Sequence, residues 1–161
     1  MFNRVSSGSA LMLILVSSIV FADAPSAPID KVYVQECGAC HAPFPRNALG
    51  VTEWQNVLRT LPNHFGTDAS VSKNDMSPIA KYLGVTDLSA TTTSTKSIER
   101  STLRVTATPW FKRKHHELNP SVWRDPRIKS LVNCGACHSQ ASSGSFRERE
   151  IQLPNGIRWD D

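Results

Sequence analysis

The sequence predicts a mostly α-helical chain with much irregular loop, folded as two small units, and three observations support this prediction. The pentapeptide Cys-Gly-Ala-Cys-His occurs at residues 37–41 and again at 134–138. Apolar residues recur at helical spacing between the two copies. A stretch rich in serine and threonine, at 89–100, then divides the chain. A chain of this length has room for one domain or two very small ones.

The repeated pentapeptide is the attachment signature of c-type haem. Its two cysteines are spaced to form thioethers with the vinyl groups along one edge of a porphyrin. The histidine that follows then lies under the ring, where its imidazole binds iron as the proximal ligand. We therefore predict two covalently bound haem c groups per chain. The residues concerned are Cys37, Cys40 and His41 in the first copy and Cys134, Cys137 and His138 in the second.

Two other uses of four cysteines fit the sequence less well. Cysteines of exported chains often form disulfides, and two Cys-x-x-Cys pairs can bind zinc. Zinc ribbons place their pairs about 15–20 residues apart, whereas residues 41 to 133 separate the pairs here. Neither use explains why a histidine follows both pairs.

Residues 1–22 have the pattern of a secretory signal peptide. Arg4 precedes an apolar stretch at residues 10–21, which is too short to span a bilayer comfortably, and small residues follow it. We expect cleavage after Ala22, with cleavage after Ala24 or an uncleaved anchor as alternatives. Haem attachment normally takes place outside the bacterial cytoplasm, so we expect a periplasmic protein without stable membrane insertion after cleavage.

Residues 23–88 are expected to form the N-terminal haem-binding unit. Residues 31–36 lead into the first pentapeptide as a short helix or strand, and the prolines after it exclude a regular helix. A helix then follows, with Thr52 as its cap and Pro62 at its end. Its apolar residues lie at i, i+3, i+4 and i+7. They are Trp54, Val57, Leu58 and Leu61.

A second helix is expected over residues 76–83. Gly84 would end it in the left-handed conformation. Pro78 fits if it lies in the first turn, where its missing N–H removes no helical hydrogen bond. Met76 lies on the apolar face of this helix, so we expect it in the core rather than at a metal.

Residues 89–100 form the predicted linker, and residues 101–161 the C-terminal haem-binding unit. Thr108 caps a helix that starts at Pro109 and is expected to continue to Asn119. We interpret the basic run at 112–114 as a solvated face of this helix, with partner docking as the alternative. The net charge of +4 is too modest, and aromatic residues are too poorly interleaved with basic ones, to indicate nucleic-acid binding.

Each iron has a second axial position, and few residues can fill it. Two of the five histidines belong to the pentapeptides. The remaining candidates are His64, His115 and His116. If residues 109–118 are helical, His115 shares an apolar face with Phe111; if they are extended, His116 is the better candidate. The Thr-Pro start favours the helix, and hence His115, with His116 as the alternative.

Several of these stretches together resemble the small dihaem cytochrome c family. They are residues 36–41, the helix around Trp54, residues 61–69, residues 108–115 and residues 133–138. The His-Phe-Gly at 64–66 is the most specific of them. The resemblance implies a small c-type cytochrome with two haem-binding units packed around covalent haems.

Members of that family are periplasmic electron carriers with a histidine on both sides of each iron. Some are thought to pass electrons to a small oxygen-binding monohaem cytochrome c, often beside a membrane b-type cytochrome. The resemblance maps the family's distal ligand onto His64 in the first half, and onto His115 or His116 in the second.

We therefore expect an electron-transfer protein rather than an enzyme, because no catalytic acid, base or nucleophile is indicated by spacing. A small dihaem peroxidase or ligand-activating haem enzyme is one alternative, and it requires an open iron position. The small dihaem subunit of periplasmic nitrate reductase is another. A haem-based sensor is a third, but no signalling or DNA-binding segment accompanies the haem motifs.

Overall fold

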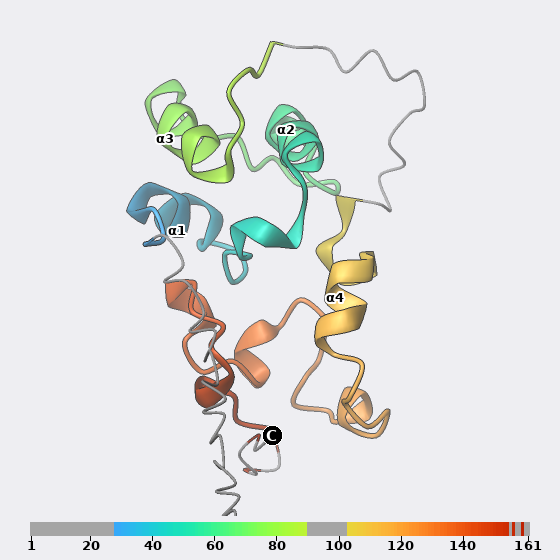
Figure 1. Cartoon of the computed structure of the whole chain (residues 1–161). Coiled ribbons are helices and arrows are strands. Elements are labelled where there is room, and N and C mark those ends of the chain that lie inside the picture. The colour runs from blue at the N-terminus through green and yellow to red at the C-terminus, as the bar shows by residue number, and fades with distance from the viewer. Residues whose placement is uncertain (1–27, 90–102, 155, 157–158, 160–161) are drawn as a thin grey trace, which may run out of the picture.

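The computed structural model describes residues 28–89, 103–154, 156 and 159. The predicted signal peptide and nearly all of the predicted linker lie outside them. The described α-helices are α1 (Lys31–Cys37), α2 (Val51–Arg59), α3 (Lys73–Leu83) and α4 (Pro109–Lys114), joined by loops and short 3₁₀ helices (Figure 1). Within these ranges β-structure is limited to two isolated bridges. The predicted fold class, mostly α with irregular loops, is confirmed.

Helix α1 carries the first cysteine of the first pentapeptide. Asp30 caps its start by accepting a hydrogen bond of 3.0 Å from the backbone N–H of Tyr33, which satisfies one of the donors that a helix start leaves unpaired. The helix ends at Cys37, and the N–H of Gly38 donates to the carbonyl of Val34. The sequence left helix and strand open for this stretch, and it is a helix.

Helix α2 has the predicted apolar face, but its ends are placed differently. Gly50 occupies the N-cap position, and Thr52, the expected cap, lies inside the helix. Glu53 then falls in the first turn, where a negative charge is favourable. The helix ends at Arg59, before Pro62, because the chain tightens into a 3₁₀ turn (Leu61–Asn63). That turn accepts the proline because its first residues need no N–H partner.

Helix α3 begins earlier than predicted, because Ser72 caps it. The Ser72 hydroxyl accepts from the N–H of Asp75 at 3.2 Å and donates to the Asp75 carboxylate at 2.6 Å. Pro78 therefore lies in the helix interior, not in the first turn as expected. The hydrogen bond lost there must be offset by burial of the apolar face of α3. Gly84, with φ of 81°, ends the helix as predicted.

Helix α4 starts as predicted and ends early. The Thr108 hydroxyl accepts a hydrogen bond of 3.1 Å from the N–H of Phe111, and Pro109 is the first helical residue. The helix stops at Lys114, short of the expected Asn119. It stops because the backbone of His115 leaves the helical region, with φ of −125°.

One hydrophobic core lies where α1, α2 and α3 meet (Figure 1). Tyr33 of α1 and Ile79 of α3 are almost fully enclosed, with exposed fractions of 1% and 0%. Leu103 and Val105, which the predicted boundary assigns to the C-terminal unit, also pack in this core. The helices of the N-terminal unit are thus held together by apolar contacts within the protein.

The chain after α4 builds little core of its own. Among the described residues from 109 onward, Ile128 and Ala141 are the only buried apolar side chains. Short 3₁₀ turns and loops follow one another there, below α1 and α2 in the view of Figure 1. None of the described helices has the length and apolar character needed to cross a bilayer.

Candidate haem sites

The first pentapeptide follows directly from α1. Cys37 is the last helical residue, and Cys40 is exposed three residues further on. Burial, and then the neighbouring Glu36 carboxylate, raises the pKa of Cys37 to about 11. The Nδ1 atom of His41 lies 2.8 Å from the carbonyl oxygen of Ala42. A carbonyl only accepts, so Nδ1 donates and Nε2 is the nitrogen left for a metal.

His64 is presented by a tight turn. Its N–H donates to the Thr67 carbonyl at 2.7 Å, and the Thr67 N–H donates back to the His64 carbonyl at 3.1 Å. Between them, Phe65 and Gly66 have φ of 52° and 99°. Glycine adopts such a conformation without steric cost, whereas phenylalanine rarely does. The Arg104 guanidinium lies 4.4 Å above the Phe65 ring and supports the turn by a cation–π contact.

His41 and His64 face each other across the first site. Their ring centroids are 6.4 Å apart, and the ring planes differ by 26°. Burial, followed by the charges of His41 and Arg104, lowers the pKa of His64. A lowered pKa favours the neutral imidazole, which is the form that binds a metal.

The second pentapeptide forms a single 3₁₀ turn, Cys134–Ala136, instead of following a helix. The N–H of His138 donates to the carbonyl of Cys134 at 2.8 Å. Residues near the C-terminus hold this turn in place. His138 forms a β-bridge with Ile151, and the N–H of Gln152 donates to the carbonyl of Cys137 at 2.8 Å. Residues 148–152 thus contribute a 3₁₀ turn (Glu148–Glu150) and one bridge.

His115, and not His116, lies opposite His138. The ring centroids of His115 and His138 are 6.2 Å apart, with the ring planes at 82°. His115 stacks on Phe111 at 4.0 Å and donates from Nδ1 to the Phe111 carbonyl at 2.8 Å. His116 is exposed, and its Nε2 lies 3.6 Å from a carboxylate oxygen of Glu117.

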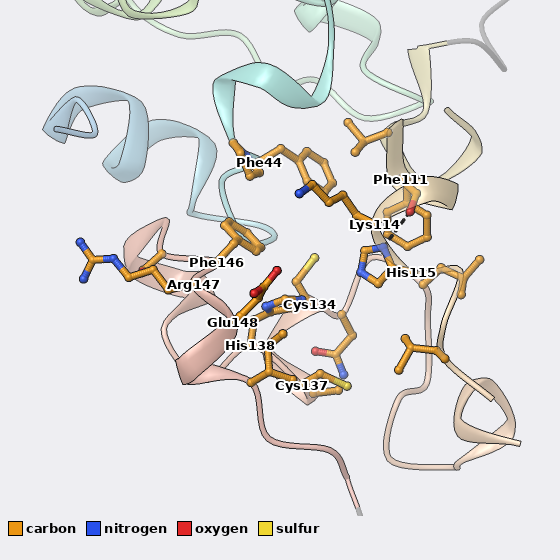
Figure 2. A pocket seen from close by; sticks show the side chains of 18 of the residues that line it. Phe44, Phe111, Lys114, His115, Cys134, Cys137, His138, Phe146, Arg147 and Glu148 are labelled. Carbon is orange, nitrogen blue, oxygen red and sulfur yellow. Dashed lines mark hydrogen bonds between the residues drawn. The ribbon is translucent and has the colours of Figure 1, made fainter. Parts of the chain in front are cut away.

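A cavity of about 520 Å³ opens around His115 and His138, a volume in the usual range of cofactor sites. Figure 2 shows both imidazoles and the side chain of Cys134 at this cavity. Most of its wall is apolar and aromatic. The largest such side chains are Phe44, Trp110, Phe111, Trp123, Phe146 and Trp159.

The donor set at both sites fits haem. In the described part of the chain, no group of three or more His, Cys, Asp or Glu could hold a bare metal ion, and none of the four cysteines is in a disulfide. A porphyrin brings four nitrogens and needs only axial ligands from the protein. Two imidazoles on one iron, with metal–nitrogen bonds of about 2.0 Å and about 1.1 Å from each nitrogen to its ring centre, have centroids about 6.2 Å apart. The observed distances are 6.4 and 6.2 Å.

The other candidate, Met76, packs against the core of the N-terminal unit and is partly buried there. It belongs to neither histidine pair.

Sequence reasoning did not select Phe44, which contacts both sites. Its ring lies 5.0 Å from that of His41, and the same side chain lines the second cavity (Figure 2). The Tyr33 hydroxyl donates to the Phe44 carbonyl at 2.7 Å and fixes the loop. The available signal was an aromatic residue between two prolines, three residues after a haem motif.

Comparison with known proteins agrees with this geometry. A family model described as dihaem cytochrome c matches residues 33–146. A search of curated proteins found no significant match.

Solved structures give the same picture. The diheme cytochrome c of Shewanella baltica OS155 is 30% identical, with a TM-score of 0.60, over 81% of this chain and 97% of that one. A crystal structure of DHC purified from Rhodobacter sphaeroides is 35% identical, with a TM-score of 0.53, over 73% of this chain and 96% of that one. A second diheme cytochrome c structure from that organism gives a TM-score of 0.54 at the same identity.

Proposed function

The chain belongs to the dihaem cytochrome c family, with two covalently bound haem c groups, and on that premise we propose that it carries single electrons between redox proteins. The observation that carries the proposal is that each pentapeptide histidine faces a second histidine. His41 pairs with His64 and His138 with His115, at the spacing that two axial ligands of one iron require. A haem with both axial positions filled is suited to electron exchange rather than to binding a substrate.

In this proposal each part of the site has a separate task. The cysteines of the two pentapeptides hold the haems, whose irons alternate between the ferric and ferrous states. Hydrogen bonds to carbonyl oxygens orient the rings of His41 and His115. Two imidazoles leave out the thioether that raises the potential of His/Met cytochromes. We therefore expect both potentials to lie well below those of a typical His/Met cytochrome c.

Phe44 supports exchange of electrons within the chain. Because its ring contacts His41 and also lines the second cavity, the two sites share one side chain. Donation from Tyr33 to the Phe44 carbonyl holds this shared wall in position. With both haems bound, Phe44 would lie against each of them, which would favour exchange of electrons between the two.

The sequence and the family resemblance support a proposal for the location and the partners. The signal-peptide pattern at 1–22 supports a periplasmic location. We propose a monohaem cytochrome c and a membrane b-type cytochrome as partners. A role as the dihaem subunit of periplasmic nitrate reductase is the alternative, and co-purification with a large molybdenum subunit would favour it.

The test uses carbon monoxide, which binds ferrous haem only where an axial position is open. The reduced wild-type protein should show no rapid Soret change with carbon monoxide. His115→Ala should convert one haem to a high-spin form that binds the gas, and His64→Ala the other. His116→Ala is the matched control and should leave both haems low-spin. Rapid binding by the wild-type protein would contradict the proposal and favour a peroxidase or another ligand-activating enzyme.

A further inference from the structure

Positive charge is concentrated in one part of this chain. Residues 105–133 contain six Lys and Arg against two Asp and Glu, a net charge of +4. Residues 28–89 form the first haem site and most of the core, and Arg104 lies against Phe65 there. Together they contain six Lys and Arg against six Asp and Glu, a net charge of zero. The modest charge of the whole chain therefore conceals a strong asymmetry between the two sites.

The basic side chains lie beside the second site. We call them the basic surface: Lys112, Arg113, Lys114, Arg124, Arg127 and Lys129, all of which are exposed. Lys114 lines the large cavity with His115 (Figure 2). Arg127 borders a surface hollow of about 280 Å³ that Ala136 and Cys137 also line. The charges thus lie on α4 and on the segment that leads into the second pentapeptide.

The fold itself uses little of this charge. Within the described ranges, the ion pair between Arg127 and Asp125, at 2.6 Å, is the only one that involves the basic surface. Cations at the end of α4 complement its dipole, but a helix of six residues does not need three of them. Val132, with an exposed fraction of 41%, adds an apolar side chain close to the second pentapeptide.

We propose that the basic surface docks an acidic redox protein, so that electrons enter or leave the chain through the second haem. This proposal rests on the proposed electron-carrier function. It adds which haem exchanges electrons with the partner and which charge the partner carries. Complementary charge around a redox site steers encounter and can raise association rates by about 10- to 10³-fold. The residues that form the first site have no net positive charge and offer an acidic partner no such attraction.

The test removes the same number of positive charges from the basic surface in one variant and from the N-terminal unit in another. The basic-surface variant is Lys112→Gln, Arg113→Gln, Arg124→Gln, and the control variant is Arg59→Gln, Lys73→Gln, Lys81→Gln, which are exposed positions of the N-terminal unit. Each variant loses three positive charges, and neither changes a residue that lines the large cavity. Haem content and potentials are measured first, to confirm that both sites remain intact.

Three reagents then report on docking at low ionic strength. Flavodoxin hydroquinone, an acidic one-electron protein, reduces the ferric protein, and hexacyanoferrate(III) oxidises the ferrous protein. The basic-surface variant should react about tenfold more slowly with both, and added salt should remove the difference from wild type. The control variant should stay within about twofold of wild type. Hexaammineruthenium(III) is a cationic oxidant. It should oxidise the ferrous basic-surface variant no more slowly than the ferrous wild-type protein.

Equal rates for the two variants with flavodoxin would overturn the docking proposal. If, in addition, the wild-type protein but not the basic-surface variant bound vesicles of anionic phospholipid, the surface would bind lipid instead. Failure of the electron-carrier function looks different. All three proteins would then react slowly with all three reagents.

Discussion

The segments around the two pentapeptides, which we predict to form two haem-binding units, share one attachment motif but are stabilised in different ways. In the N-terminal unit, three helices bury a continuous core that includes Tyr33 and Ile79. In the C-terminal unit, the described chain from 109 onward buries two apolar residues and wraps a large cavity lined by aromatic rings. A short chain segment that buries so few apolar side chains needs another source of core to be stable. We infer that a haem would supply the missing core of the second unit, whereas in the first it would be added to a core already present.

Removing each haem in turn should expose this difference most strongly. In Cys134→Ala, Cys137→Ala, residues 109–153 should lose nearly all protection from hydrogen exchange, because their core is gone. In Cys37→Ala, Cys40→Ala, the helices of the N-terminal unit should keep much of theirs. Hydrogen exchange followed by mass spectrometry measures both variants. Equal loss of protection in the two units would show that both depend on haem alike.

Two tryptophans give the next largest contrast. Trp54 is 5% exposed, and its indole N–H donates to the Arg46 carbonyl at 2.7 Å. Trp54→Ala should lower the free energy of unfolding by about 3–5 kcal/mol, the range for large buried aromatic residues. Trp123 is only half-buried, at the wall of the cavity. Denaturant titration should show a smaller loss for Trp123→Ala, and the opposite order would contradict the assignment of the core to the first unit.

A smaller effect is expected at the loop that joins the sites. Burial raises the pKa of Tyr33, so its hydroxyl stays protonated and donates to Phe44. Tyr33→Phe leaves that carbonyl without its donor and should lower the free energy of unfolding by about 1–3 kcal/mol. Tyr82→Phe is the control, since its half-buried hydroxyl forms no hydrogen bond within the described chain. Equal stability of the two variants would remove the role given to Tyr33.

The smallest effect concerns the interaction of Asp125 with Arg127 in the C-terminal unit at low pH. Hydrogen bonds from Arg127, first from its side chain and then from its backbone, lower the pKa of Asp125 from 3.8 to about 2. Because the pKa of Asp125 is lowered in the folded state, its ionised carboxylate stabilises the fold at pH values above its ordinary pKa. This contribution is lost as the pH falls from about 4 to about 2. Protection of the amides near residues 125–127, taken relative to their intrinsic exchange rates, should fall across that window. Asp125→Asn should abolish the pH dependence.

The sequence predicted the parts of this molecule that depend on neighbouring residues. The Thr108 cap, the Gly84 terminus and the pentapeptides are local signals, and helical spacing was enough to place His115 beside Phe111. The helix starts at Val51 and Lys73 were placed wrongly, because more than one residue can serve as a cap. Phe44 contacts both sites, and Leu103 packs in the first core. Both contacts join segments that are distant in the sequence. No periodicity encodes such contacts.

The angle between the imidazole planes, 26° in the first pair and 82° in the second, has a magnetic consequence. Each ring interacts with the iron d orbital that lies perpendicular to its plane. Nearly parallel rings act on one orbital and separate its energy from that of its partner, whereas perpendicular rings act on both and leave them nearly equal. With the proposed ligands, the first ferric haem should give a rhombic electron paramagnetic resonance signal. The second should give a strongly anisotropic one, so two haems with identical ligands can be followed separately without a label.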